Sequence, residues 1–421
     1  MTLLGFRRRC RLVCELYKSR DIGDLANYTL TFPKKTCNIF PEFIMPNVID
    51  LFSGAGGLSL GAARAGFNVI AAVENDKFAI DTHTRNFPNV HHLQQDVTAI
   101  TATDIRSNVE IDNNDLFGVI GGPPCQGFSS IGNQNVYDPR NVLFHKFFEF
   151  VAELHPDFYL VENVPGILNK KYNELRTAAL SQLDGYTKLP PLTICAFDYG
   201  APTFRTRIFF IGYRNDLKNK IIEQDFINAK VPQNTTPVVE DALRGLPKRI
   251  CFSKNNTGQC VMEENYLADK TLLNNYFHSR VISHIPHGVG QKNSIDDYLE
   301  HGIVSGCFFT NHTAEVQDRY RKVKCGKADK ISKSIKLKPN SFCPTLRAGT
   351  GPERGSYQAV RPLHYKSPRV ITPREAARLQ GFPDWFVFQP TIWHSFRQIG
   401  NSVSPLVAER VMSVIYQKLT L

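Results

Sequence analysis

The chain has 421 residues, of which 42% are hydrophobic and 21% charged, values close to those of ordinary globular proteins. This composition excludes a mainly disordered, collagen-like or coiled-coil protein. The chain also has no run of about 18 apolar residues, the length that a membrane-spanning helix needs. Lysine and arginine number 50 against 39 aspartate and glutamate, giving a net charge of +11. Such a surplus favours a polyanionic partner such as nucleic acid, although many basic proteins are simply soluble.

The first 44 residues show little hydrophobic periodicity and carry a basic cluster at 7–9. We expect this extension, 1–44, to be disordered or to precede a biological start at Met45; a small DNA-contacting or regulatory arm is the alternative. It is too short and too broken by arginine to be a secretory signal. The 10 cysteines form no CxxC pair, so zinc-ribbon spacing is absent; we expect no metal site, and reduced thiols in a cytoplasmic protein.

From Met45 to about residue 212, short apolar strands alternate with helical segments. This alternation predicts an α/β fold with a doubly wound, mostly parallel sheet covered on both faces, which binds ligands at the carboxyl ends of its strands. The expected strands are 48–52, 68–73, 116–120, 158–161 and 208–211, and the expected helices are 77–86 and 143–154.

The alternation stops over 213–366, which is rich in Asn, Ser, Lys, Gly and His. We interpret this stretch as a second, smaller domain, and its basic cluster 319–324 as a solvated helix face. The closing segment, 367–421, is compact again, with a helix start at Thr372 that has Pro373 and a capping-box Glu375.

A glycine-rich turn follows the first strand in the segment 50–58, Asp-Leu-Phe-Ser-Gly-Ala-Gly-Gly-Leu. A strand, glycine turn and helix let the backbone approach a ligand closely. Glu74, at the end of the next strand, can accept both ribose hydroxyls of a nucleoside; alone, the pair also fits a tight turn with a surface acid. Asp96 can accept from an adenine amino group, or it is an ordinary helix N-cap.

Two candidate catalytic groups follow strands that end at the same edge of the sheet. Cys125 lies on a loop stiffened by two prolines and surrounded by glycine, which suits a nucleophile better than a core cysteine. Glu162 ends the next strand and can act as a partly desolvated acid. Arg205 and Arg207 project to one side of an extended segment and can bind a phosphate or a base carbonyl.

These segments, in this order, resemble the cytosine-C5 DNA methyltransferase family, of the prokaryotic restriction–modification type. The resemblance covers most of the chain from Met45 onwards. It rests on the glycine-rich turn, Pro124-Cys125-Gln126, Glu162-Asn163-Val164, the Arg205-x-Arg207 pair and Gln398-Ile399-Gly400-Asn401-Ser402-Val403.

The resemblance implies a Rossmann-like domain, 45–212, that binds S-adenosylmethionine, a target-recognition domain within 213–366, and a segment, 367–421, that returns to the first domain. The residues that it implies for the cofactor are Phe52, Gly54, Gly57, Leu58, Glu74, Asn75, Asp96, Val97, Pro124, Leu143, Asn401 and Ser402. For DNA it implies Gln126, Ser129, Thr345 and Leu346.

The implied reaction is methylation of cytosine C5 in a specific duplex sequence. The Cys125 thiolate adds to C6 of a flipped base, Glu162 contacts N3 and the amino group, Arg207 faces the base carbonyl or phosphate, and Arg205 helps to orient Glu162. Thr203 stands where the family usually has Gln, which slightly alters the surroundings of the flipped base.

The expected partners are double-stranded DNA and, functionally, a cognate restriction endonuclease, with the enzyme acting as a monomer. Three alternatives remain: an RNA cytosine methyltransferase of this fold, a catalytically silent relative, and a dehydrogenase on a dinucleotide-binding fold.

Overall fold

The structure is a computed structural model in which the chain from Met45 to Thr420 is described with short gaps. Residues Met45–Leu421 form one compact unit. The expectations for 1–44, Cys125, Gln126 and Ser129 lie outside the described residues. The described ranges are 45–109, 117–124, 141–232, 234–247, 258–263, 266–308, 310–349 and 361–420.

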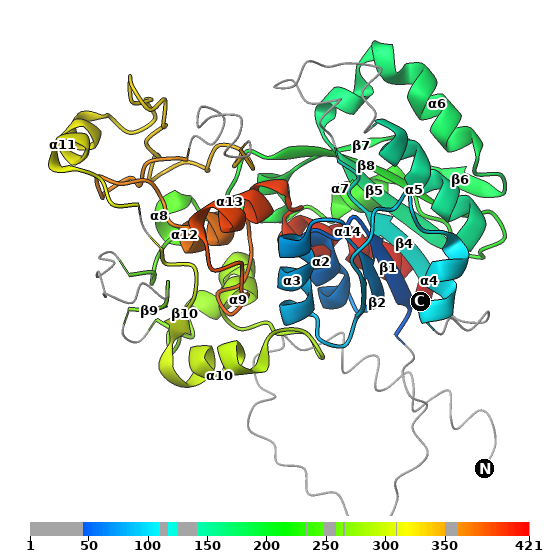
Figure 1. Cartoon of the computed structure of the whole chain (residues 1–421), viewed down its shortest axis with the longest axis horizontal. Coiled ribbons are helices and arrows are strands. Elements are labelled where there is room, and N and C mark those ends of the chain that lie inside the picture. Colours follow the sequence, from blue (N-terminus) through cyan, green and yellow to red (C-terminus); the bar gives the residue numbers. More distant parts are fainter. Residues whose placement is uncertain are drawn as a thin grey trace, which may run out of the picture. The chain divides into compact units, whose positions relative to one another are not determined.

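An eight-stranded sheet organises this unit, with strands in the order β3-β2-β1-β4-β5-β8-β6 and β7 paired with β8 (Figure 1). Strands β1 to β5 run parallel, while β8 is antiparallel to β5, β6 and β7. The predicted doubly wound α/β fold is therefore confirmed. The strands are β1 (Asn47–Leu51), β2 (Asn68–Val73), β3 (His91–Leu93), β4 (Phe117–Gly121), β5 (Phe158–Asn163), β6 (Tyr186–Lys188), β7 (Leu192–Cys195) and β8 (Thr206–Arg214).

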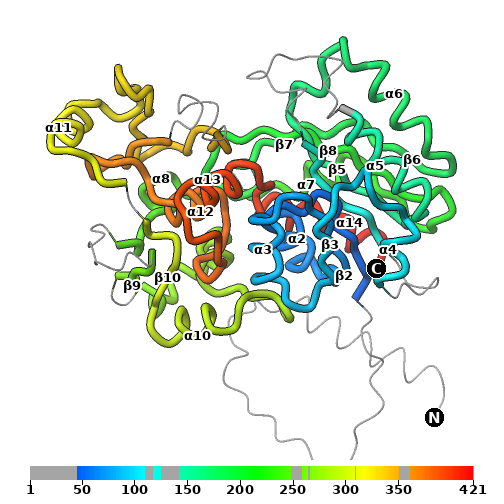
Figure 2. Tube along the Cα trace, in the orientation of Figure 1, coloured from blue at the N-terminus to red at the C-terminus, as the bar shows by residue number. Residues whose placement is uncertain are grey.

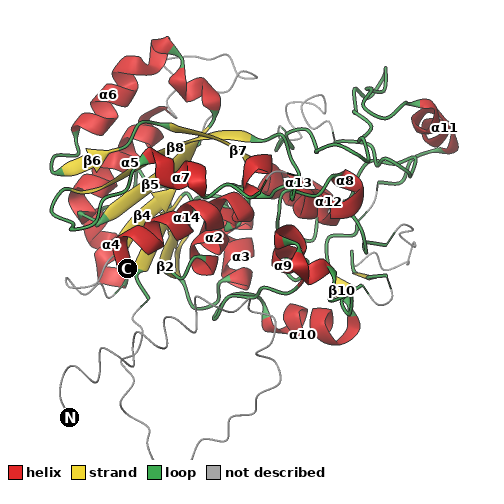
Figure 3. Ribbon diagram, turned by 180° about the vertical axis from the view of Figure 1, so that it is seen from behind, coloured by secondary structure: helices red, strands yellow, loops and turns green. Residues whose placement is uncertain are grey.

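Helices cover both faces of the sheet, as Figure 3 shows with strands in yellow and helices in red. Neighbouring residues of one strand enter different cores: Val48 packs in one hydrophobic cluster and Ile49 in the other. This follows from the two-residue period of a strand. The helices around the sheet are α2 (Gly57–Arg64), α3 (Lys77–Asn86), α4 (Ala102–Asn108), α5 (Asn141–Leu154), α6 (Asn173–Ser181) and α14 (Pro405–Thr420).

The last helix packs against the first helix of the sheet domain, although they stand at opposite ends of the described chain. Figure 2 shows α14 beside α2. A Cβ atom at Gly61 would lie 2.2 Å from Cβ of Ala408, so glycine permits the close approach of the two helices. The C-terminal segment is thereby held on the sheet domain.

Beyond the sheet, the middle of the chain forms short helices joined by long loops. The expected capping box at Thr372 is confirmed: its hydroxyl accepts from Glu375 N at 3.1 Å and its N–H donates to Glu375 Oε2 at 2.8 Å. No described helix is both long and apolar enough to cross a membrane. The further helices are α7 (Glu223–Asn228), α8 (Val239–Ala242), α9 (Tyr276–Ile282), α10 (Lys292–His301), α11 (Ala314–Lys322), α12 (Pro373–Leu379) and α13 (Ile392–Asn401), with strands β9 (Cys260–Val261) and β10 (Ile303–Val304). Single 3₁₀ turns occupy Pro165–Leu168, Lys170–Tyr172, Ala196–Tyr199 and Leu272–Asn274.

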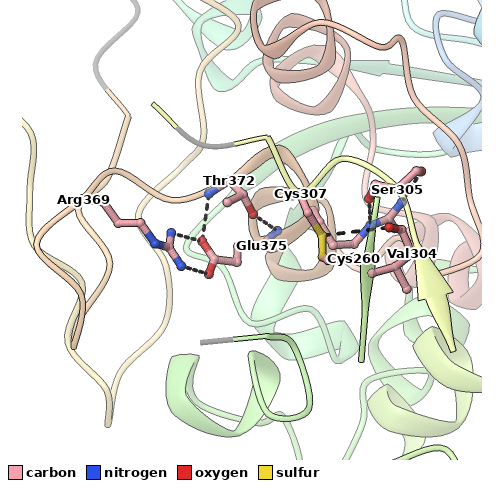
Figure 4. The surroundings of a disulfide bond; sticks show 8 residues. Cys260, Val304, Ser305, Cys307, Arg369, Thr372 and Glu375 are labelled. Atoms are coloured by element: carbon pink, nitrogen blue, oxygen red, sulfur yellow. Dashed lines mark hydrogen bonds and ion pairs between the residues drawn. A yellow bond between two sulfur atoms is a disulfide. The ribbon is translucent and has the colours of Figure 1, made fainter. Parts of the chain in front are cut away.

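The expectation that the cysteines are all reduced is wrong for one pair. Cys260 and Cys307 form a disulfide with an S–S distance of 2.04 Å (Figure 4). They lie 47 residues apart in sequence, and the antiparallel pairing of β9 with β10 brings their segments together. Because this contact depends on tertiary strand pairing, the cysteine spacing alone did not indicate it.

Opening this disulfide should destabilise the protein. Reduction should lower the free energy of unfolding by about 2–4 kcal/mol, because the bond closes a long loop in the unfolded chain. Urea unfolding with and without dithiothreitol measures the difference. A Cys260→Ala/Cys307→Ala double variant is the control, since its urea midpoint should not change when the reductant is added. An unchanged midpoint for the unsubstituted protein, with both thiols shown to be free, would contradict the prediction.

Candidate active site

A cavity of about 320 Å³ lies at the carboxyl ends of the parallel strands. Strand β1 lies between β2 and β4, so the strand order reverses here, which is where open α/β sheets bind ligands. All twelve residues expected at the cofactor line this cavity, together with three of the four expected catalytic residues: Phe52, Gly54, Gly57, Leu58, Glu74, Asn75, Asp96, Val97, Pro124, Leu143, Glu162, Arg205, Arg207, Asn401 and Ser402.

The glycine-rich turn is shaped by backbone conformations that ordinary residues rarely adopt. Phe52 has φ of 64° and Gly54 has φ of 56°. A non-glycine residue in the left-handed region costs on the order of 1–3 kcal/mol and is often found at functional sites. Gly57 has no room for a side chain, because a Cβ atom would lie 2.4 Å from the carbonyl oxygen of Val403. The turn is thus pressed between the sheet and the C-terminal segment.

Glu74 is fixed by the turn that it faces. Its Oε2 accepts from Gly54 N at 2.9 Å and its Oε1 accepts from Asp76 N at 2.8 Å. Burial raises the pKa of Glu74, and these hydrogen bonds only partly offset that effect. A carboxylate held by two backbone donors at a cavity wall is well placed to accept hydrogen bonds from a diol.

Asp96 lines the cavity and also orders its own turn. Its Oδ1 accepts from Thr98 N at 2.9 Å and from Thr98 Oγ1 at 2.7 Å, and these bonds lower its pKa. Asn75 donates to the other oxygen at 3.4 Å. Asp96 therefore lies at the cavity wall as expected, and the alternative that it is a helix N-cap is wrong, since Thr101 caps α4.

Glu162 is the last residue but one of β5 and lines the same cavity, where it is paired with Arg207. Nε of Arg207 lies 2.7 Å from Oε1 of Glu162, and a Cβ atom at Gly122 would lie 3.4 Å from Oε2. Asn163, the next residue, donates to the carbonyl oxygen of Pro123 at 3.4 Å. The carboxylate is thus set beside 121–124, the segment that leads to Cys125.

Arg207 makes the contact with Glu162 that we expected of Arg205. Nη1 of Arg205 donates to the carbonyl oxygens of Leu346 at 3.3 Å and Gly400 at 2.9 Å, and Nη2 of Arg205 donates to that of Asn401 at 3.3 Å. Arg205 is buried. It therefore ties the start of β8 to two later segments, including the end of α13 that carries Asn401.

Thr203 and the expected DNA-contacting pair lie beside this junction. Thr203 is fully buried, and its hydroxyl donates to the carbonyl oxygen of Cys343 at 3.1 Å. The Thr345 hydroxyl donates to the carbonyl oxygen of Phe204 at 2.8 Å, and Leu346 is buried. None of Thr203, Thr345 and Leu346 is among the described residues that line the cavity.

Sequence reasoning missed several cavity residues. Asp50 and Ser53 belong to the glycine-rich segment itself, while His394 and Arg397 come from α13. Arg397 pairs with Asp76 at 2.7 Å, and the ring of His394 lies 3.8 Å from that of Phe78. In a helix that ends at Asn401, Arg397 and His394 lie one and two turns earlier on the same face. This spacing could have indicated that they reach the same cavity as Asn401.

The comparisons with known proteins agree with this architecture. A family model described as C-5 cytosine-specific DNA methylase matches residues 46–417. The chain belongs to this family. Its enzyme class is DNA (cytosine-5-)-methyltransferase, and the dehydrogenase alternative is excluded.

Relatives of this methylase match it over most of its length. Type II methyltransferase M.XorII of Xanthomonas oryzae pv. oryzae is 35% identical over 382 residues, covering 89% of this chain and 85% of the relative. Type II methyltransferase M.DdeI of Desulfomicrobium norvegicum is 32% identical, with 86% of each chain covered. A solved E. coli structure described as a DNA modification methyltransferase encoded within a prophage has 46% identity and a TM-score of 0.77, covering 89% of this methylase and all of that chain.

Proposed function

We propose that this methylase transfers a methyl group from S-adenosylmethionine to C5 of cytosine in a specific duplex DNA sequence, through a covalent Cys125–C6 intermediate with base flipping. The observation that carries the proposal is a single cavity lined by both Glu162 and the nucleoside-type residues around Glu74. Pro124, the residue before Cys125, lines the same cavity.

The cavity fits S-adenosylmethionine by its polar groups. Glu74 suits the ribose hydroxyls, Phe52 the adenine face, and Asp96 with Val97 the adenine edge. Ser53 Oγ and Asp50 Oδ1 are buried without a hydrogen-bond partner among the described residues, and such atoms favour a polar ligand. When bound, the cofactor supplies an electrophilic methyl group on a sulfonium. Gly54, Gly57, Leu58, Asn75, Pro124, Leu143, Asn401 and Ser402 would complete its site.

The chain's own residues supply the activation of cytosine. The Cys125 thiolate adds to C6, which makes C5 nucleophilic. Glu162 contacts N3 and the exocyclic amino group and supplies a proton as negative charge builds on the ring. Because Arg207 binds Oε1 of Glu162, the carboxylate is held with Oε2 available to the base. After transfer, a base removes the C5 proton and the thiolate leaves by elimination.

The DNA substrate is proposed on charge and on the family. The net charge of +11 suits neutralisation of backbone phosphates, which gives affinity without sequence information. We assign target recognition to 213–366 and DNA contacts to Gln126, Ser129, Thr345 and Leu346. The catalytic and cofactor domain is 45–212, with 367–421 returning to it.

The biological role that we propose is protection of DNA from a cognate restriction endonuclease, by a monomer acting in the prokaryotic cytoplasm at the nucleoid. The family and the names of the relatives support modification within a restriction–modification system.

Bisulfite sequencing of DNA from a methylation-deficient host tests the proposal. Expression of the full chain should leave cytosines resistant to conversion in one short recurring sequence. A Cys125→Ala variant should leave none, since the nucleophile is lost. Complete conversion in both samples, with soluble protein present, would contradict methylation of DNA.

The RNA alternative is separated by a parallel assay of labelled methyl transfer to duplex DNA and to tRNA. Transfer to DNA alone is expected. Transfer to tRNA alone would replace the proposed substrate while keeping the chemistry.

A further inference from the structure

Behind the glycine-rich turn, side chains from four elements form one continuous hydrogen-bonded chain. The Ser59 hydroxyl on α2 donates to Oδ2 of Asp50 on β1 at 2.5 Å. Nε2 of His83 on α3 lies 3.0 Å from Ser59 Oγ, and Nδ1 of His83 lies 2.8 Å from Nε2 of His92 on β3. Asp50, Ser59 and His83 are fully buried, whereas His92 is half-buried on the edge strand. This row of hydrogen-bonded side chains therefore extends from the cavity wall to the edge of the sheet.

Along this row of side chains, each hydrogen bond is donated in the direction of Asp50. The Ser59 hydroxyl has one proton and gives it to the carboxylate, so its oxygen must accept from His83 Nε2. Nδ1 of His83 then accepts from Nε2 of His92. Burial, reinforced by His92, holds the pKa of His83 well below its usual value, so a neutral imidazole in this tautomer fits the geometry.

The other oxygen of Asp50 is left to accept a hydrogen bond. Oδ1 is buried without a hydrogen-bond partner among the described residues, and Asp50 is one of the residues that line the cavity. Burial raises the pKa of Asp50 to about 7; the Ser59 hydrogen bond opposes this effect and Glu74 adds to it. A cationic donor stabilises the ionised form of a buried carboxylate whose pKa is raised in this way.

His83 also supports the glycine-rich turn by packing. Its ring stacks on Phe87 with centroids 4.3 Å apart. A Cβ atom at Gly56 would lie 2.4 Å from Phe87 and 3.1 Å from His83. The imidazole is thus fixed directly beneath the turn, and it cannot leave Ser59 without disturbing the packing there.

We propose that Asp50, Ser59, His83 and His92 form a positioning relay that holds Asp50 Oδ1 for the ammonium group of the bound cofactor and couples cofactor affinity to pH. The relay rests on the proposed use of S-adenosylmethionine. Asp50 is its binding group, while Ser59, His83 and His92 act through it. The other titratable or charged groups that face the relay or share its cavity are His91, Glu74, Asp76, Asp96, Glu162, Arg205, Arg207, His394 and Arg397.

The sign of the pH dependence follows from the charge on Asp50. An ammonium group binds the ionised carboxylate, so affinity should rise with pH up to about 7 and fall again near about pH 8, where the α-amino group of the cofactor itself loses its proton. Below about pH 7 the dissociation constant should increase by up to about tenfold per pH unit. Ser59→Ala removes a hydrogen bond that favours ionised Asp50, so the midpoint should move to higher pH.

Calorimetric titration of the full chain with S-adenosylmethionine, between about pH 6 and pH 8.5, tests the relay. At the acidic end, Ser59→Ala should bind about tenfold more weakly than wild type, the loss of one charge-assisted hydrogen bond, and the two should converge at the alkaline end. His83→Phe should shift the midpoint in the same direction. Asp50→Asn should bind weakly and should lack the rise in affinity up to about pH 7.

Matched controls separate positioning from folding. His287→Gln changes an exposed histidine outside the relay and its cavity and should leave the profile unchanged. Equal weakening of Ser59→Ala at every pH, or an unshifted midpoint, would overturn the relay. Absence of binding by wild type at any pH would overturn the proposed cofactor itself, and the relay's ligand with it. Histidine ¹⁵N NMR of the free protein adds a readout independent of the cofactor: the relay requires neutral His83 with its proton on Nε2.

Discussion

Replacing Glu162 with glutamine should lower kcat for methyl transfer by about 10²–10⁴-fold, the range typical of a lost general acid. Glutamine keeps the shape of the side chain but cannot give up a proton to the ring. Glu162 lies at the end of β5 beside Gly122 and is paired with Arg207, so the substitution leaves the nucleotide-type groups around Glu74 untouched. Affinity for S-adenosylmethionine should therefore stay close to that of wild type.

Single-turnover transfer of a labelled methyl group to duplex DNA measures this loss, and calorimetry of cofactor binding measures the affinity. Glu149→Gln is the matched control, because Glu149 is a half-exposed acid on α5 paired with Lys146; it should have wild-type kcat. A kcat loss below about tenfold for Glu162→Gln would remove Glu162 from the proton transfer. An equal loss of cofactor affinity would make it a binding residue instead.

The cavity could be predicted because its residues follow strands. Phe52, Glu74 and Glu162 come at the carboxyl ends of β1, β2 and β5, and parallel strands bring those ends to one edge. Asp50 was missed because it lies within the apolar run of the first strand. Only the fold shows that its side chain accepts from Ser59 and that the residue belongs to the cavity wall.

The different roles of the two arginines could not be predicted from their spacing. Alternation along an extended segment places Arg205 and Arg207 on one side, and both do line the cavity. What separates them is the set of carbonyl oxygens at Leu346, Gly400 and Asn401. Those acceptors come from segments more than a hundred residues away, so local sequence carries no signal for them.

The region after the sheet illustrates a second limit of sequence reasoning. Its polar composition indicated a separate smaller domain but gave no account of what orders it. In the structure, a buried arginine of α12 binds carbonyl groups outside its own helix: Arg374 donates to Ser305 O of the middle region at 2.7 Å and to Pro383 O, nine residues away, at 2.9 Å. Because hydrophobic periodicity finds apolar faces, it does not detect an interior organised in this way.

Replacing Arg378 with alanine should lower the free energy of unfolding by about 3–5 kcal/mol, because it leaves Asp384 buried without its counter-charge. Both side chains are completely buried, and Nε of Arg378 lies 3.0 Å from Oδ1 of Asp384. Burial alone would lower the pKa of Arg378, but the neighbouring Asp384 more than reverses this and raises it. Arg378 also donates to the carbonyl oxygens of Ala242 and Arg244, so its loss leaves further polar groups unsatisfied.

Urea unfolding of the full chain measures this difference, with Arg321→Ala as the matched control. Arg321 forms an ion pair with Asp318 on α11, and both side chains are more than half exposed, so its loss should cost less than about 1 kcal/mol. An Arg378→Met/Asp384→Leu double variant should recover much of the stability lost in Arg378→Ala, since a buried ion pair exchanged for apolar groups is often neutral. If Arg378→Ala were as stable as Arg321→Ala, the pair would not hold α12 against the loops at 242–244. If the double variant were as unstable as Arg378→Ala, the carbonyl contacts rather than the unpaired charge would account for the loss.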